Sequence, residues 1–145
     1  MSSGKRQDLT ESLWREIRHF IAGVILFNLK VADGLGVNGT DLQCLHVLDL
    51  QGFATPGELA RWTGLTTGGI TVVLDRLEKA GYLVRAPNPA DRRSLIVRPV
   101  RTHLRRLRRI YRAKSKALKG VLAEYDATEL ALLLDFFRKT NSRSR

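Results

Sequence analysis

The chain has 145 residues, of which 43% are hydrophobic, with a formal net charge of +11 and a pI near 10.7. This length suits one domain with a core, the apolar content excludes a disordered tail protein, and the charge favours a polyanionic partner. The single cysteine excludes an internal disulfide framework and predicts a cytoplasmic protein. The apolar run Phe20–Leu29 is too short to span a bilayer, so no membrane partner is expected.

Residues 8–32 are predicted to form a long helix whose apolar residues occupy more than one face, so it needs more than one packing partner. On this helix Trp14, Arg18 and His19 combine apolar and cationic groups. Such a mixture could line a cavity that binds a small aromatic or carboxylate effector.

Thr40 and Gln43 form a candidate capping box for a second helix that runs through about Leu50. Two of its residues permit alternative roles. Cys44 could be a redox sensor, but its apolar neighbours favour an inert buried thiol. His46 could face an effector pocket or, as we favour, complete the hydrogen bonds of the helix.

Residues 55–81 predict two helices joined by a tight turn. Thr55, Pro56 and Glu58 supply an N-cap, a first-turn proline and a capping-box partner for the first helix. A second helix is expected from Thr66 or Thr67 to Gly81, with Ile70, Val73, Leu74 and Leu77 as its buried stripe. In a helix-turn-helix the second helix enters the major groove of DNA. The residues expected to face outward include Thr67, Gly68, Thr71, Val72, Asp75 and Arg76.

Residues 82–101 predict a β-hairpin. Tyr82–Arg85 and Ser94–Arg98 have strand composition, and Pro87, Asn88 and Pro89 between them are turn formers. We expect the intervening loop to project Asp91, Arg92 and Arg93, with the Asp91 carboxylate orienting the guanidinium of Arg93. Arginines so placed suit a narrow minor groove or a row of phosphates, whereas a solvated polar turn is the alternative interpretation.

Two more helices are predicted, one from Thr102 to about Tyr125 and one capped by Asp126 and Glu129. Thr102 is the candidate cap of the former, and Asn141–Arg145 resembles a frayed basic tail. Residues 101–119 hold nine basic side chains and no acidic one. Arg101, Arg105 and Arg106 could contact DNA flanks, but a solvated helical face is the favoured interpretation.

Residues 66–97, TTGGITVVLDRLEKAGYLVRAPNPADRRSLIV, closely resemble the recognition helix and wing of the MarR family of bacterial winged-helix regulators, and a looser similarity covers nearly the whole chain. The resemblance implies a dimer with a DNA-binding lobe in mid-chain and a ligand-responsive repressor or activator. By position, Thr66–Arg76 match the helix that enters the major groove, and Asp91 with Arg93 match the wing pair. The family usually runs from the second wing strand through a leucine and a threonine into a helix, and the segment Arg98–His103 departs from this pattern. Within it Pro99 cannot donate to a sheet ladder, which affects the geometry where the chain leaves the wing.

The sequence therefore predicts a mostly α protein with a small β-hairpin wing. We expect a single domain containing a winged helix-turn-helix lobe at residues 40–100 and a helical dimerisation region at residues 8–34 and 102–140. Apolar stripes on the outer helices exceed what one chain can bury, which favours a homodimer. No HExxH, GxSxG, P-loop or Cys/His metal pattern occurs, so neither an enzyme nor a cofactor is expected.

The predicted function is a DNA-binding transcriptional regulator acting at the nucleoid as a homodimer on a pseudo-palindromic operator in double-stranded DNA, namely a repressor released by a small ligand. The alternatives are a ligand-independent architectural DNA-binding protein and a helical protein-interaction adaptor. The candidate DNA-binding residues are Thr66, Thr67, Gly68, Thr71, Val72, Arg76, Asp91, Arg92 and Arg93. The candidate effector-binding residues are Trp14, Arg18 and His46.

Overall fold

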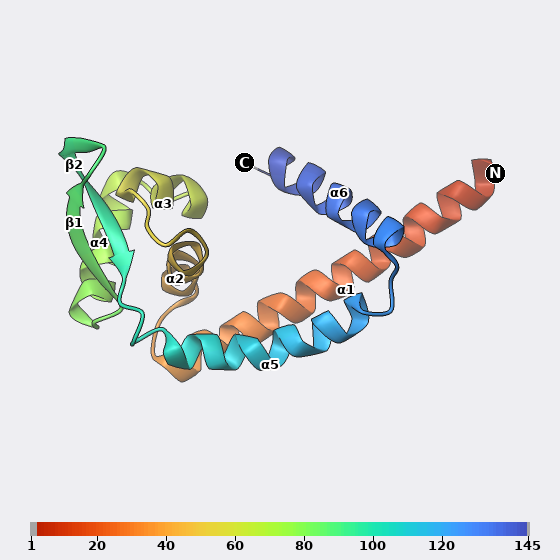
Figure 1. Cartoon of the computed structure of the whole chain (residues 1–145), viewed down its shortest axis with the longest axis horizontal. Helices are drawn as coiled ribbons and strands as arrows, with labels where there is room; N and C mark the ends of the chain where they lie inside the picture. Colours follow the sequence, from red (N-terminus) through yellow and green to blue (C-terminus); the bar gives the residue numbers. More distant parts are fainter. Residues whose placement is uncertain (1–2, 145) are drawn as a thin grey trace. The chain divides into compact units, whose positions relative to one another are not determined.

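The computed structural model describes residues 3–144, which form six helices and one two-stranded antiparallel sheet (Figure 1). This confirms the predicted fold class. The chain separates into two compact units, with the boundary after Gln43 inside α2. The elements in chain order are α1 (Ser3–Leu35), α2 (Gly39–Gln51), α3 (Pro56–Thr63), α4 (Thr67–Lys79), β1 (Leu83–Asn88), β2 (Asp91–Pro99), α5 (Arg105–Leu122) and α6 (Ala127–Arg143).

The 33-residue helix α1 extends beyond its predicted bounds at both ends. Of its residues only Val31 and Ala32 are buried. Large apolar side chains are exposed along most of its length, namely Leu9, Leu13, Trp14, Phe20, Ile21, Ile25, Leu26 and Leu29. Within residues 3–144 no single helix is long and apolar enough to cross a membrane, and α1 with α2 passes that test only as a pair bent by 96°.

The start of α2 differs from the prediction. The side chain of Asn38 accepts a hydrogen bond from the backbone N–H of Asp41 at 2.8 Å, and Thr40 already lies inside the helix. Asparagine is as effective an N-cap as threonine, and here it stands one residue before the helix begins. The proposed capping box of Thr40 and Gln43 is therefore wrong, although the helix itself is confirmed.

The helix-turn-helix follows its predicted signals closely. The Thr55 hydroxyl accepts from the backbone N–H of Glu58 at 3.1 Å, and the Glu58 carboxylate accepts from that of Thr55 at 2.9 Å. This reciprocal capping box begins α3, which ends at Gly64 with φ of 72°. Thr66 caps α4, and Gly81, with φ of 81°, follows its end. Positive φ at these two turns is a conformation that glycine adopts without strain.

The hairpin has longer strands and a shorter connection than predicted. β1 includes Pro87 and Asn88, β2 begins at Asp91, and only Pro89 and Ala90 separate the strands. The Asn88 side chain stabilises the turn, because its Oδ1 accepts from the backbone N–H of Ala90 and its Nδ2 donates to the Ser94 hydroxyl, each at 3.0 Å. The expected projecting loop is therefore wrong, since Asp91, Arg92 and Arg93 belong to a strand. Pro99 pairs with Leu83 at the last position of the ladder, where a missing donor costs least.

A continuous apolar core holds α3, α4 and the hairpin together. α3 contacts α4, α4 contacts β1, and α3 contacts β2. The backbones of Ala54 and Val97 exchange two hydrogen bonds, which attaches the segment before α3 to the wing. The largest fully buried side chains of these elements include Leu59, Ile70, Leu74, Leu77, Leu83 and Ile96.

The last two helices differ in how they begin. α5 begins at Arg105 without a side-chain cap, and the Thr102 hydroxyl lies 3.5 Å from Nδ1 of His103. The predicted start and cap at Thr102 are wrong, because residues 101–104 form a turn instead. The capping box of Asp126 and Glu129 is confirmed for α6, which has no buried residue. It continues to Arg143, so the tail predicted from Asn141 is helical through that residue, and Arg145 lies outside the described residues.

Candidate nucleic-acid interface

One face of α4 is buried and the opposite face is exposed. Ile70, Val73, Leu74 and Leu77 lie in the core. Of the candidate DNA-binding residues on this helix, Thr67, Gly68, Thr71, Val72 and Arg76 are exposed, as is Asp75 beside them. The exposed face therefore carries small or β-branched residues toward its N-terminal end. Such side chains can contact thymine methyl groups or make single hydrogen bonds, but they lack the bidentate geometry that discriminates guanine or adenine strongly.

The threonine hydroxyls of this segment are partly used within the helix. Thr66 accepts from the backbone N–H of Gly69 at 3.1 Å, and Thr71 donates to the carbonyl of Thr67 at 2.9 Å. The two glycines have different surroundings. A Cβ on Gly69 would lie 3.3 Å from the Thr66 hydroxyl, whereas one on Gly68 would meet open space. Gly69 therefore makes room for the cap, and Gly68 leaves the helix backbone open to a ligand.

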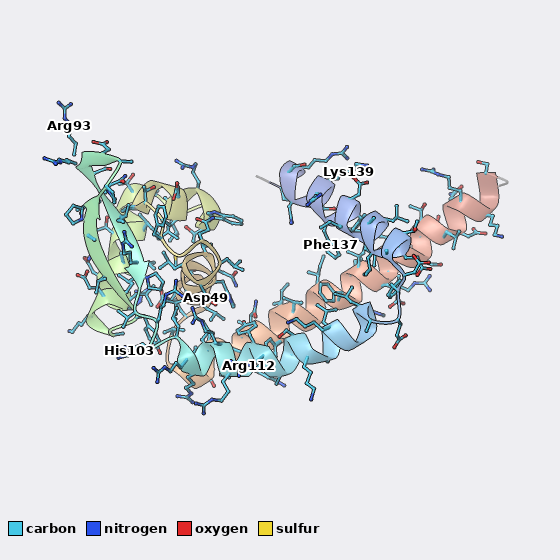
Figure 2. All side chains as sticks on the ribbon, viewed as in Figure 1. Asp49, Arg93, His103, Arg112, Phe137 and Lys139 are labelled. Atoms are coloured by element: carbon cyan, nitrogen blue, oxygen red, sulfur yellow. The ribbon has the colours of Figure 1, made fainter. Side chains whose placement is uncertain are left out.

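At the wing tip Arg92 and Arg93 are exposed, and Figure 2 shows Arg93 extending away from the ribbon. The Asp91 carboxylate accepts a hydrogen bond from the backbone N–H of Arg93 at 3.0 Å. Among the described residues the Arg93 guanidinium has no ion-pair partner, so the expected orientation of this guanidinium by Asp91 is wrong. A carboxylate two residues upstream reaches the backbone in an Asx-type turn, which orients the strand rather than the side chain.

A cluster that the sequence interpretation missed connects α4 to β1. The Arg85 guanidinium donates to Asp75 Oδ1 at 2.6 Å and to Glu78 Oε1 at 3.0 Å. The backbone N–H of Arg85 also donates to Glu78 Oε2, at 3.1 Å. Partial burial lowers the pKa of Arg85, but hydrogen bonds and the charges of Asp75 and Glu78 more than offset this, so the pKa is raised. The sequence signal was two carboxylates three residues apart on one helix face, followed by an arginine in the next strand.

A second polar cluster connects α2 to α5. The Arg108 guanidinium donates from Nε at 2.8 Å and from Nη2 at 2.5 Å to the same oxygen of Asp49. The His46 ring lies edge-on to Tyr111, with ring centroids 4.5 Å apart. Among residues 3–144 no hydrogen bond joins this ring to the helix backbone, so the favoured role of its side chain is wrong. Burial lowers the pKa of His46 despite the opposing charge of Asp49, and burial also raises the pKa of Tyr111. Arg108, which belongs to the basic run 101–119, thus forms an ion pair with Asp49. Arg101, Arg105 and Arg106 of the same run are exposed.

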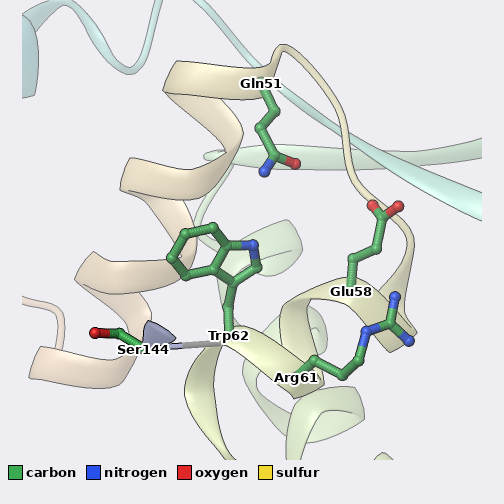
Figure 3. A pocket seen from close by; sticks show the side chains of 5 residues that line it. All are labelled: Gln51, Glu58, Arg61, Trp62 and Ser144. Atoms are coloured by element: carbon green, nitrogen blue, oxygen red, sulfur yellow. The ribbon is translucent and has the colours of Figure 1, made fainter. Parts of the chain in front are cut away.

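Two shallow cavities are candidate ligand sites. One, of about 440 Å³, lies along α1 and includes the predicted Trp14, Arg18 and His19. His46 is not among its lining residues. The other, of about 380 Å³, was not predicted and is shown in Figure 3. Its lining residues are Gln51, Glu58, Arg61, Trp62 and Ser144.

Cys44 is fully buried, as the favoured interpretation required. Within residues 3–144 no group of three or more His, Cys, Asp or Glu side chains is arranged to hold a metal ion.

The lobe thus has the defining parts of a winged helix-turn-helix: a capped helix pair with an exposed second helix, followed by a hairpin with arginines at its tip. A profile of the MarR family matches residues 35–94. The chain is 34% identical over 134 residues to the uncharacterised HTH-type transcriptional regulator YcgE of Bacillus subtilis, covering 92% of this chain and 87% of that protein. It is also 34% identical over 64 residues to the multiple antibiotic resistance protein MarR of Salmonella typhimurium, covering 44% of each chain.

Among solved structures, a MarR family protein from Bacillus stearothermophilus matches with a TM-score of 0.69 at 18% identity, covering 95% of this chain and 96% of that one. This likeness concerns the fold. Together with the sequence matches it establishes the family: the chain belongs to the MarR family of winged-helix, DNA-binding transcriptional regulators.

Proposed function

We propose that this regulator binds double-stranded DNA as a homodimer at a pseudo-palindromic operator and represses transcription until a small ligand lowers its affinity. The observation that carries the proposal is the exposed face of α4 beside a wing whose second strand carries the exposed Arg92 and Arg93 close to the turn. The net charge of +11 supports a polyanionic partner. A cytoplasmic site of action, at the nucleoid, follows from this function.

The two parts of the lobe would divide the work of recognition. The exposed threonines, Gly68 and Val72 of α4 would contact the major groove, where we expect modest direct discrimination between bases. Arg93, whose guanidinium is unpaired within the described residues, would enter the minor groove. There it would respond to groove width at A·T-rich flanking steps.

The dimer is supported by the apolar side chains that the long helices expose. α6 buries none of its residues within the chain but exposes large apolar ones, including Leu130, Leu134 and Phe137 at helical spacing. Burial of such faces against a second copy is the economical way to remove them from water. Two α4 helices in one dimer would then reach half-sites about one helical turn apart.

The effector is proposed to be a small aromatic or carboxylate compound. The cavity on α1 offers an indole from Trp14 and cations from Arg15 and Arg18. An aromatic ring could stack on the indole while a carboxylate pairs with the guanidinium groups.

DNase footprinting across the promoter regions of the source genome, followed by binding titrations on the protected sequence, tests the function. We expect a symmetric footprint and an affinity that falls with salt, with a slope of roughly −0.9 in log K against log salt per phosphate neutralised. Binding without sequence preference would favour an architectural protein, and an affinity that does not change with salt would favour an adaptor.

Arg93→Ala and Arg105→Ala separate minor-groove recognition from simple phosphate contact. We expect Arg93→Ala to weaken binding and to reduce the preference for A·T-rich over G·C-rich flanks. Arg105→Ala, at the exposed start of α5, should weaken binding equally to an operator with A·T-rich flanks and to one with G·C-rich flanks. Equal weakening of both operators by Arg93→Ala would show that the wing arginine is only an electrostatic anchor.

A further inference from the structure

Asp75 is an unusual residue for a surface that approaches DNA. It lies four residues after Thr71 on the exposed face of α4, and its side chain is 64% exposed. Glu78 follows three residues later with 42% of its side chain exposed. Two carboxylates near a phosphate backbone would repel it, because DNA affinity depends mainly on the neutralisation of phosphate charge.

Arg85 of β1 forms ion pairs with both carboxylates. Its side chain is 23% exposed, and its two terminal nitrogens donate to different acidic residues, to Asp75 at 2.6 Å and to Glu78 at 3.0 Å. Glu78 is held from two directions, because its other carboxylate oxygen accepts the backbone N–H of Arg85. A planar guanidinium suits this bridging role, whereas a lysine ammonium is a single point charge.

We propose that Arg85 is a positioning residue for DNA recognition: it fixes the wing to the recognition helix and neutralises the carboxylates of Asp75 and Glu78, without itself contacting phosphate. The inference rests on the proposed DNA-binding function. It adds a positioning residue that is not among the candidate DNA-binding residues, because Arg85 acts through its two acidic partners.

The ion pairs of Arg85 are expected to contribute little to the free energy of folding, so its role is in recognition and not in folding. Exposed ion pairs contribute little to folding stability, because solvent screens them and two side chains must be ordered. The lobe is already held together by a buried core and by the hydrogen bond from Tyr82 N–H to the Leu77 carbonyl at 3.0 Å, which closes the turn after α4. Arg85 therefore matters for where the wing lies and for the charge that α4 presents.

The experiment is a double-mutant cycle on operator binding. Its variants are Arg85→Gln, the pair Asp75→Asn with Glu78→Gln, and all three substitutions together. Arg98→Gln is the matched control, because Arg98 is an exposed arginine on the other strand of the same hairpin and has no ion pair among the described residues. Each protein is first checked for folding by circular dichroism, so that affinities are compared between folded proteins.

We expect Arg85→Gln to weaken operator binding about tenfold, the order of one lost charge-assisted hydrogen bond, while the slope of log K against log salt stays unchanged. In the background without the carboxylates, Arg85→Gln should have an effect of less than about twofold, because the interaction it served is already absent. Hydroxyl-radical footprints of Arg85→Gln should lose protection at the minor-groove flanks more than at the centre of each half-site. Arg85→Lys should recover only part of the affinity.

Three results would overturn the inference while leaving the proposed function intact. They are an equal loss in both backgrounds, a salt slope reduced by roughly 0.9, which marks a direct phosphate contact, and an affinity indistinguishable from wild type. Arg98→Gln should behave independently of the carboxylates in every case. If wild-type protein shows no operator-specific binding at all, the proposed function itself has failed, and this outcome is distinguishable from the other three.

Discussion

The winged lobe and the long helices of this chain differ in how far their apolar side chains are exposed to solvent. In the lobe, helix stripes such as Ile70, Leu74 and Leu77 are buried almost completely. In α6 no residue is buried, and Leu134 and Phe137 are 49% and 52% exposed. Both regions show apolar residues at helical spacing in the sequence, but among the described residues those of the lobe are buried and those of α6 are exposed.

This difference predicts which parts of the protein are stable without a second subunit. The lobe has its own core, capped helices and closed turns, so its stability should not depend on a second copy. Leu130, Leu134 and Phe137 of α6 lie at helical spacing and are exposed, and exposed apolar residues that lie together on one helix face often mark an interface. The stability of the long helices should therefore depend on protein concentration.

Leu134→Glu should produce the largest effect, because it places a charge in the proposed interface of each subunit. We expect the dimer dissociation constant to rise by at least about 100-fold, since an unpaired buried charge costs several kcal/mol. Lys139→Gln, on the opposite side of α6, is the control and should leave dimerisation unchanged. Analytical ultracentrifugation measures both, and a fully dimeric Leu134→Glu would exclude this face from the interface.

Leu74→Ala should destabilise the lobe by about 2–5 kcal/mol, because it removes a fully buried side chain and leaves a cavity. The loss should be the same at all protein concentrations, unlike that caused by a substitution in α6. Urea unfolding followed by circular dichroism measures it. Val72→Ala, at an exposed position of the same helix, should change stability by no more than about 0.5 kcal/mol.

The two capping boxes allow the same motif to be compared in both regions. Thr55→Ala should cost about 1 kcal/mol in the lobe, independent of protein concentration. Asp126→Ala removes the corresponding cap of α6, where we expect weaker dimerisation as well as lower helix stability. Unfolding curves at two protein concentrations distinguish these outcomes. Identical behaviour of the two variants would contradict the proposed difference between the lobe and the long helices.

The smallest effect should be the pH dependence that His46 contributes. Burial lowers its pKa in the folded state below the ordinary 6.5, so the unfolded chain binds the proton more readily. Stability should be fully present above pH 6.5 and should decrease as pH falls through the lowered pKa. His46→Gln should flatten this decrease in thermal unfolding measured across pH. An unchanged profile would show that other groups cause it.

The sequence was most informative where a local rule decides the structure. Thr55, Glu58 and Gly81 fixed the helix-turn-helix because caps and left-handed turns depend on immediate neighbours. It was less informative where competing donors lie close together, as when Asn38 capped α2 in place of Thr40. The pair of Arg108 and Asp49 depends on tertiary approach across 59 residues of sequence, and no spacing rule predicts it. The partners of Arg85 lie only seven and ten residues away, but their pairing depends on how β1 packs against α4.

The central claim is that the lobe is stable alone, whereas the long helices need a second subunit. Sedimentation equilibrium of the full chain tests this claim most directly. At micromolar concentration we predict a mass twice the 16.3 kDa of one chain. Dilution should produce dissociation accompanied by loss of helical circular dichroism signal. A stable 16.3 kDa species that keeps its full helical signal at every concentration would contradict the account.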